Sequence, residues 1–292
     1  MKPPAFDYSR PETLEEAVGL LAELSSGGKV LAGGQSLLPI LSMRLAAPEH
    51  LVDINRIAEL DTISAGPDGV RLGALARHAA VERDPAVRST QPLIPAALRQ
   101  VAHPTIRNRG TTLGSIVHAD PSGEMPAVLA LLGGSVTAVS ARGRRTISAA
   151  EFFLGPLESA LGPDEIAVEA YFPALAVRSG TAFAEVSRRH GDYAVCGVAA
   201  LVSVDQERRI TSARAGYLSI ASTPLVLDLT EAVLGRRCAD DLSAAGRLAR
   251  QLVEPDADIH ASADYRRDLA GVLSDRVITE AARAAAGSGP GD

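Results

Sequence analysis

The sequence predicts an α+β protein, in which helices and strands alternate too irregularly for a doubly wound parallel sheet. A helix–strand–helix–strand pattern fills residues 1–57, and a mixed region with a long glycine-rich stretch follows over 58–175. Residues 176–286 begin with three strand-like apolar runs and end in helices. With 292 residues, 46% of them hydrophobic, the chain is long enough to bury a sizeable core.

The first unit, residues 1–57, has the clearest local signals. Thr13 stands before two glutamates, and apolar residues then recur at helical spacing, which predicts a helix within 9–26. The stretch 29–34 reads as a buried strand that ends in a turn, and 36–48 as a helix whose first turn tolerates Pro39. A further strand is predicted over 50–54.

The second unit, residues 58–175, and the third, residues 176–286, are predicted from shorter patterns. In the second unit we expect strands over 69–75, 135–141 and 164–173, helices over 78–89, 93–102 and 125–133, and irregular structure over 103–124. In the third we expect a three-stranded meander over 181–189, 194–204 and 209–220, and helices over 223–235, 242–253 and 263–286. Residues 287–292 are predicted to be a disordered tail.

Composition excludes several functional classes. The net charge of -6 and pI near 5.6 argue against nucleic-acid binding. Two cysteines, Cys196 and Cys238, are too few for a zinc site or an iron–sulfur cluster, and we expect them to be reduced. The start has no signal-peptide core and no apolar run could span a bilayer, so we expect a cytoplasmic location without a membrane span. No hydrolase motif is present, which favours a protein that holds a cofactor.

Two glycine-rich stretches are the first candidates for a site. Gly33 and Gly34 lie between a strand and a helix, where backbone amides can form a concave anion site beside the hydroxyl of Ser36. An ordinary tight turn is the alternative explanation. The second stretch, 103–127, adds hydroxyl and glycine positions and then two carboxylates. Amides at one end and carboxylates at the other suit a dinucleotide, since carboxylates accept hydrogen bonds from ribose.

Two further features have competing explanations. Tyr193, in the stretch 187–195, could lie against a flat cofactor ring or simply pack on the core beside a solvated turn. His118 next to Asp120 has no third ligand at suitable spacing, so a structural hydrogen bond is favoured over a metal site. Neither glycine stretch matches G-x-G-x-x-G or a P-loop.

Taken together, these stretches resemble the FAD-binding medium subunit of the molybdenum hydroxylases. This family includes the flavoprotein of carbon monoxide dehydrogenase, the FAD domain of xanthine dehydrogenase and nicotine-type dehydrogenases. The resemblance runs over nearly the whole chain, through "AGGQSLLPILSMRLAAPEHLVDI", "IRNRGTTLGSIVHADPSGEMPA" and "VSRRHGDYAV". It implies a two-part FAD-binding region of the vanillyl-alcohol oxidase-like type, followed by a C-terminal domain with a small antiparallel sheet and helices.

The resemblance also implies which residues bind the cofactor. Residues 32–36 would wrap the FAD diphosphate, and the loop at 111–115 would form a second contact on the phosphate side. Glu124 would bind the adenosine ribose, and Tyr193 would lie beside the isoalloxazine. One departure is Leu113, where the family usually has glycine. The full implied set is Ala32, Gly33, Gly34, Gln35, Ser36, Leu37, Val101, Ala102, Thr111, Gly114, Ser115, His118, Asp120, Glu124 and Tyr193. No catalytic residue and no metal ligand is expected in this chain.

In such complexes a large subunit carries the molybdenum–molybdopterin cofactor and a small subunit carries two [2Fe–2S] clusters. The resemblance implies that this chain passes electrons from a cluster to an external acceptor, within a heterohexamer that is a dimer of heterotrimers. The complex would oxidise carbon monoxide or an N-heterocycle or aromatic substrate. Two alternatives stay open: a self-contained FAD-dependent oxidoreductase, and an assembly or regulatory protein with a vestigial nucleotide pocket.

Overall fold

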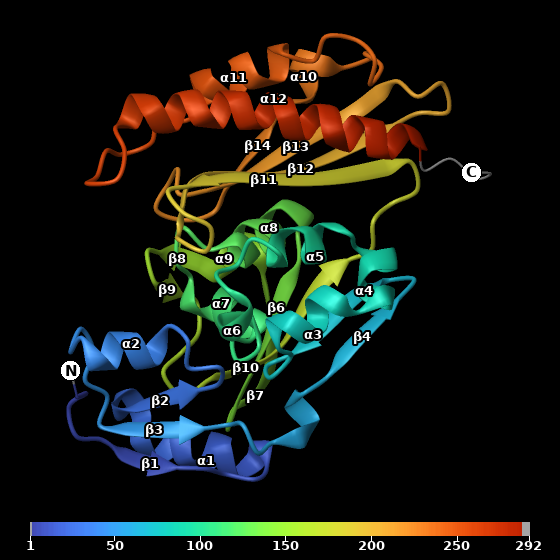
Figure 1. The fold of residues 1–292 in the computed structure, drawn as a ribbon. Helices are drawn as coiled ribbons and strands as arrows, with labels where there is room; N and C mark the ends of the chain where they lie inside the picture. Colours follow the sequence, from blue (N-terminus) through green and yellow to red (C-terminus); the bar gives the residue numbers. More distant parts are fainter. Residues whose placement is uncertain (1, 288–292) are drawn as a thin grey trace.

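A computed structural model of the chain describes residues 2–287 (Figure 1). The α+β prediction is confirmed: three stacked parts follow one another along the chain, each built on its own sheet. The predicted tail at 287–292 lies outside the described residues except for Gly287, which is the last residue of a helix. Over residues 2–287, no helix is long and apolar enough to cross a membrane.

The N-terminal part is a parallel sheet with the strand order β1-β3-β2. Thr13 caps the predicted first helix, because its hydroxyl accepts a hydrogen bond from the amide of Glu16 at 3.2 Å. The second helix is shorter than predicted and ends at Ser42. The elements are β1 (Asp7–Ser9), α1 (Leu14–Leu24), η1 (Ser25–Gly27), β2 (Gly28–Leu31), α2 (Leu37–Ser42) and β3 (His50–Asp53).

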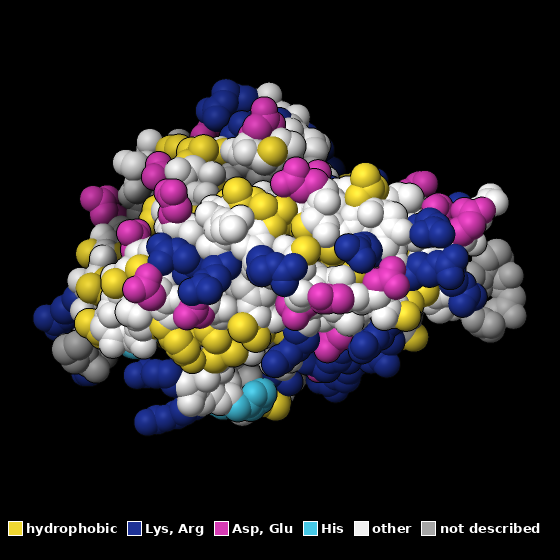
Figure 2. All heavy atoms as spheres, turned by 90° about the horizontal axis from the view of Figure 1, so that it is seen from above, with side chains coloured by type: hydrophobic (Ala, Val, Ile, Leu, Met, Phe, Trp, Pro, Cys, Tyr) yellow, Lys and Arg dark blue, Asp and Glu magenta, His cyan; other side chains and the backbone are white. Residues whose placement is uncertain are grey.

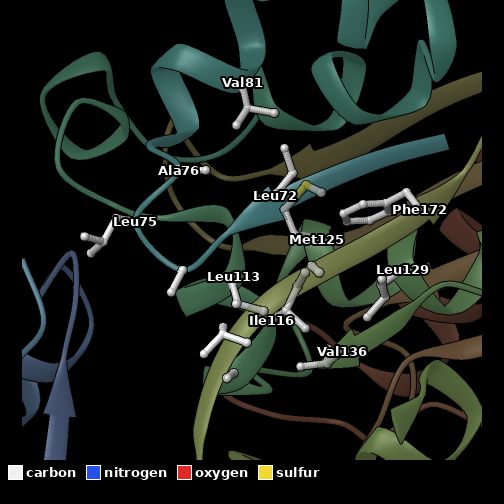
Figure 3. Close-up of a cluster of buried hydrophobic side chains, with 14 of the residues drawn as sticks. Leu72, Leu75, Ala76, Val81, Leu113, Ile116, Met125, Leu129, Val136 and Phe172 are labelled. Atoms are coloured by element: carbon white, nitrogen blue, oxygen red, sulfur yellow. The ribbon is translucent and has the colours of Figure 1, made fainter. Parts of the chain in front are cut away.

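The middle part is an antiparallel sheet with the order β4-β5-β10-β6-β7, and helices cover it. Its strands are β4 (Ile63–Gly66), β5 (Gly69–Gly73), β6 (Ser135–Ser140), β7 (Gly143–Ser148) and β10 (Ile166–Pro173), with a small hairpin of β8 (Phe153–Gly155) and β9 (Glu158–Ser159). Its helices are η2 (Ala58–Leu60), α3 (His78–Arg83), α4 (Pro85–Thr90), α5 (Leu93–Leu98), α6 (Pro104–Arg107), α7 (Thr112–His118), α8 (Glu124–Leu132) and α9 (Ala149–Phe152). Figure 3 shows how Leu72, Val136 and Phe172 of this sheet meet side chains of α7 and α8.

Two predictions for the middle part were wrong. The helix expected over 78–89 is split into α3 and α4, because Asp84 is extended before Pro85 and its carboxylate caps α4. The stretch 103–124, expected to be irregular, contains α6, α7 and the start of α8. Short helices of this kind depend on burial of side chains such as Leu113 and Ile116, which local sequence does not reveal.

The C-terminal part contains a four-stranded antiparallel sheet, not the three-stranded meander expected, and three helices. Residues 225–228, expected to be helical, pair with β13 as an edge strand, and only a short helix follows. There Asp228 accepts the amide of Thr230 at 2.9 Å, which closes the turn. The elements are β11 (Ser179–Ser187), β12 (Ala194–Val204), β13 (Ile210–Leu218), β14 (Leu225–Asp228), α10 (Thr230–Val233), α11 (Ala244–Leu252) and α12 (Ala263–Gly287).

The C-terminal sheet is covered on both faces. Helix α12 lies on its outer face and the middle part lies against its inner face (Figure 1). Seen from above, on the side of the C-terminal helices, positive and negative side chains are intermingled (Figure 2). Cys196, a free cysteine as expected, is buried in the outer core of this sheet, and Cys238 is also free.

Candidate functional site

The first glycine-rich loop connects β2 to α2, and its own backbone bonds fix its shape. Gly34 has a φ of +73°, a conformation that favours glycine, and its carbonyl accepts the amide of Leu38 at 3.0 Å. The side-chain amide of Gln35 donates to the carbonyl of Gly33 at 3.2 Å. The loop is therefore an ordered turn with several amides clustered at the start of a helix.

The second loop lies directly against the first. A Cβ atom placed on Gly33 would lie 2.6 Å from the carbonyl oxygen of Arg109 and 2.8 Å from the Cα of Gly110. Both distances are well below van der Waals contact, so only glycine permits this approach. The structure thus brings together two stretches that are some seventy-five residues apart, as the predicted site requires.

Buried polar contacts hold the second loop in place. The carbonyl of Gly110 accepts the amide of His78 at 3.0 Å, and the amide of Thr112 donates to Ala76 at 3.0 Å. Thr111 caps α7 by accepting the amide of Gly114 at 3.2 Å. The hydroxyl of Thr112 is bonded to the His78 ring at 3.2 Å, and burial lowers the pKa of His78 to about 4, which keeps that ring neutral at pH 7.

Leu113, the departure from the family pattern, points away from this loop surface. Its side chain is 1% exposed and belongs to the core that Figure 3 shows beneath α7. A glycine there would remove a core side chain, and the leucine does not place bulk between the two loops.

An arginine and an asparagine that sequence reasoning missed connect the loops. Asn55 donates to the carbonyl of Ala32 at 2.8 Å, and its own side-chain oxygen accepts from Arg77. The guanidinium of Arg77 also donates to the carbonyl of Arg109 in the second loop. No local motif marks these two residues, because their role appears only when distant segments meet.

Two hydroxyls on the loops have no hydrogen-bond partner among the residues that the structure describes. Ser36 precedes α2 but caps none of its amides, and Ser115 is the middle residue of α7. Both side chains are half-buried. Because a hydroxyl is a natural donor to a phosphate oxygen, these free groups and the clustered amides fit an anionic ligand.

The carboxylate end of the site gathers Asp120, Glu124 and Tyr193. Glu124 begins α8, and burial followed by the charge of Asp120 raises its pKa to about 7. Tyr193 is 67% exposed as a residue, and partial desolvation of its hydroxyl, followed by the charge of Asp120, raises its pKa. Nearby, burial lowers the pKa of the half-buried His118.

The loop that carries Tyr193 rests on the middle part of the molecule. Gly191, with a φ of +87°, lies against the ring of His103, and His190 meets the same ring edge to face at a centroid distance of 5.9 Å. Hence residues from the C-terminal part reach the side of the second glycine loop.

Three residues of the predicted set, Leu37, Val101 and Ala102, lie next to the two glycine loops along the chain and not within them. Leu37 is the first residue of α2 and is half-buried. The carbonyls of Val101 and Ala102 accept hydrogen bonds from Arg107 at 3.0 and 3.2 Å, and Ala102 has a φ of +44°. This segment precedes the second loop and is tied to it through Arg107.

Comparisons with known proteins match the two halves of this architecture. Residues 4–175 match the family described as the FAD binding domain in molybdopterin dehydrogenase, and residues 181–281 match the CO dehydrogenase flavoprotein C-terminal domain. The chain is 41% identical to the caffeine dehydrogenase subunit beta of Pseudomonas sp. (strain CBB1), covering 97% of this chain and 96% of that one. It is 38% identical to the nicotine 6-hydroxylase medium subunit of Paenarthrobacter nicotinovorans, covering 96% and 99%.

A solved structure agrees with these sequence matches. In a carbon monoxide dehydrogenase from Hydrogenophaga pseudoflava, one chain superposes with a TM-score of 0.91 at 36% identity, covering 98% of this chain and 99% of that chain. The expected resemblance is confirmed: the chain belongs to the family of FAD-binding medium subunits of molybdenum-containing dehydrogenases.

Proposed function

We propose that this chain binds one FAD across its two glycine loops and transfers electrons within a molybdenum-containing dehydrogenase complex. The observation that carries the proposal is the contact between Gly33 and the Arg109–Gly110 backbone, fixed by Asn55 and Arg77. It creates one continuous surface of amides and free hydroxyls from two distant segments.

Each end of this surface suits a different part of the cofactor. The amides of residues 33–36 and the hydroxyls of Ser36 and Ser115 would hold the diphosphate, with Thr111 and Gly114 shaping the second loop. The carboxyl group of Glu124 would accept a hydrogen bond from a ribose hydroxyl, since a carboxylate repels phosphate. Tyr193 would lie beside the isoalloxazine. The remaining members of the predicted set, including His118 and Asp120, stay predictions as cofactor contacts.

The chain's own task is binding and orientation. Bound FAD supplies the conversion between one-electron and two-electron transfer, so the protein needs no catalytic acid, base or metal of its own. We infer that electrons arrive from a [2Fe–2S] cluster of a small subunit and leave to an external acceptor. The large subunit would hold the molybdenum–molybdopterin cofactor in a dimer of heterotrimers, and a cytoplasmic location stays a prediction.

For the substrate of the complex we propose an N-heterocycle. The large subunit contacts the substrate, so this inference rests on the relatives: the two named above for caffeine and nicotine are 41% and 38% identical, and the carbon monoxide dehydrogenase chain is 36% identical. Carbon monoxide is the competing substrate in the experiment that follows.

The test is the visible spectrum of the purified complex and of the isolated chain, with the released chromophore identified by chromatography. We expect one FAD per copy of this chain, bleached in the complex by an N-heterocycle and left oxidised in the isolated chain. A Ser36→Ala, Ser115→Ala double variant should lose FAD, whereas Ser64→Ala, on an exposed strand position, should not. A complex that refuses added FAD would overturn the proposal, and bleaching of the isolated chain by substrate would indicate a self-contained oxidoreductase.

A further inference from the structure

The two faces of strand β11 carry different neighbours. Side chains alternate along a strand, and Ala182, Ala184 and Val186 all pack into the outer core beneath α12. Phe183 points the other way and packs with Ala127 of α8 at the boundary between the middle and C-terminal parts. Glu185 is two residues after Phe183, so it lies on the same inner face, toward α8 (Figure 1).

This boundary is fastened close to Glu185. Ser219, which follows β13 with a φ of +61°, donates its amide to the carbonyl of Pro121 at 2.8 Å. Its hydroxyl contacts the hydroxyl of Ser122 at 2.8 Å and the carbonyl of Ala194 at 2.6 Å. The segment from Asp120 to Glu124 is thereby held against the C-terminal sheet.

Glu185 itself has an unusual environment for a carboxyl group. Its Oε2 atom is buried and has no hydrogen-bond partner among the described residues. Its neighbour on β12 is Gly197, which offers no side chain, and the charged group that acts on it is another carboxyl, that of Glu124. Burial, with the charge of Glu124, raises the pKa of Glu185 to about 8.

A buried oxygen without a partner is costly to a folded protein unless something else supplies the hydrogen bond. Within residues 2–287 no cation forms a salt bridge with Glu185, and the charged group that acts on it is Glu124. With its pKa raised to about 8, Glu185 is a neutral carboxyl at pH 7, and its carbonyl oxygen can accept a hydrogen bond from a neutral donor. Ribityl hydroxyls and the ring N–H of a flavin are donors of this kind.

We propose that Glu185 is a further cofactor-binding residue, contributed by the C-terminal domain, whose buried carboxyl oxygen accepts a hydrogen bond from a ribityl hydroxyl or the ring N–H of the bound flavin. The inference rests on the proposed function, since it requires FAD at the site. It assigns the C-terminal sheet a direct polar contact with the cofactor.

The test compares FAD binding by the reconstituted complex containing Glu185→Ala, Glu185→Met or Glu185→Gln. Methionine fills similar space without the oxygens, and glutamine keeps an acceptor oxygen. Removing one hydrogen bond is expected to raise the Kd for FAD about tenfold in the alanine and methionine variants. The glutamine variant should stay within about threefold of the unaltered protein, and Glu207→Gln, an exposed turn residue, should bind normally.

Thermal unfolding of the cofactor-free chain separates this role from a structural one. Removing a buried, unpaired carboxyl should leave the apoprotein equally stable or more stable, so weaker FAD binding would occur without loss of Tm. Unchanged FAD affinity in both the alanine and methionine variants would overturn the inference while leaving the proposed function intact. Failure of the unaltered complex to bind FAD would overturn both.

Discussion

The contact between the two glycine loops can be tested by adding a single methyl group. In Gly33→Ala the new Cβ would lie 2.6 Å from the Arg109 carbonyl, 2.8 Å from the Gly110 Cα and 3.0 Å from the Thr111 nitrogen. All three neighbours are backbone atoms, which no rotamer change can move. The loops must therefore separate by about 0.8 Å, the difference between 2.6 Å and the 3.4 Å of ordinary contact.

A separation of this size has two calculable effects. Overpacking of a tight contact costs roughly 1–3 kcal/mol, so the unfolding free energy should fall by that amount. A ligand that bridges both loops would find its hydrogen bonds to one of them stretched from about 2.9 Å to beyond 3.5 Å, where little bonding remains. Losing one hydrogen bond to a charged diphosphate costs about 1.5–3 kcal/mol, which corresponds to a roughly 10- to 150-fold higher Kd for FAD.

The assay is titration of FAD into the apo-complex, followed by quenching of flavin fluorescence, together with denaturant unfolding of the chain. Gly19→Ala is the control, because that glycine lies in α1 with nothing within 4 Å of its added Cβ. The control should bind FAD normally and gain up to about 1 kcal/mol of stability from helix propensity. If Gly33→Ala lowers stability but leaves the FAD Kd unchanged, the loop contact is structural only and the bridging argument is refuted.

Three further perturbations probe other contacts. In Gly191→Ala the Cβ would lie 2.4 Å from the His103 ring at a φ of +87°, so the Tyr193 loop should shift and bound-flavin fluorescence should change. Gly235→Ala is the control for backbone strain alone, because Gly235 has a φ of +72° and open space around its added Cβ. Equal effects of the two substitutions would argue against the loop contact. Ser274→Ala leaves the fully buried Tyr217 hydroxyl without its 2.7 Å partner, so the free energy of unfolding in urea should fall by about 1–3 kcal/mol while FAD affinity stays unchanged. Adding Tyr217→Phe should recover part of this loss, and no recovery would contradict the hydrogen-bond explanation. Burial raises the pKa of Glu124 to about 7 and that of Glu185 to about 8, so the folded state holds protons that the unfolded state releases near pH 4. The stability that these two carboxyls contribute to the apoprotein is therefore complete below about pH 4 and declines as pH rises from about 5 to about 8, with a shallower decline in Glu185→Gln. A Tm that rises between about pH 5 and about 8 would show that the sign is wrong.

The glycine loops can be recognised in the sequence more readily than the polar residues that connect them, for a physical reason. Glycine permits a positive φ, as at Gly34, or a close approach of backbone, as at Gly33, so these two positions stand out in the sequence without knowledge of tertiary contacts. Asn55 and Arg77 are ordinary polar residues whose partners in the glycine loops are 23 and 32 positions away, and they bond each other across 22 positions. Their role exists only in the folded state.

The fold errors have a related cause. The strand at 225–228 carries the apolar pattern of a helix as readily as that of an edge strand, and pairing with β13 decides between them. Strand β1 is three residues long, and it is recognisable only through its register with β3. By contrast, the eleven-residue β12 and the long helix α12 were predicted, because a long apolar or periodic run leaves fewer alternatives.

The two ends of the candidate site differ in how firmly they are held. Direct backbone contacts, a capping threonine and the Arg77 network fix the glycine loops, so their shape exists without the cofactor. The Tyr193 loop contacts the middle part through Gly191 and His190, which lie against the ring of His103, and its tyrosine is 67% exposed. If FAD binds as proposed, rigid loops at its diphosphate and a more exposed end at its ring would suit the proposed exchange of electrons with partners outside this chain. Glu185 would then add a polar contact from the C-terminal sheet to those that the glycine loops provide.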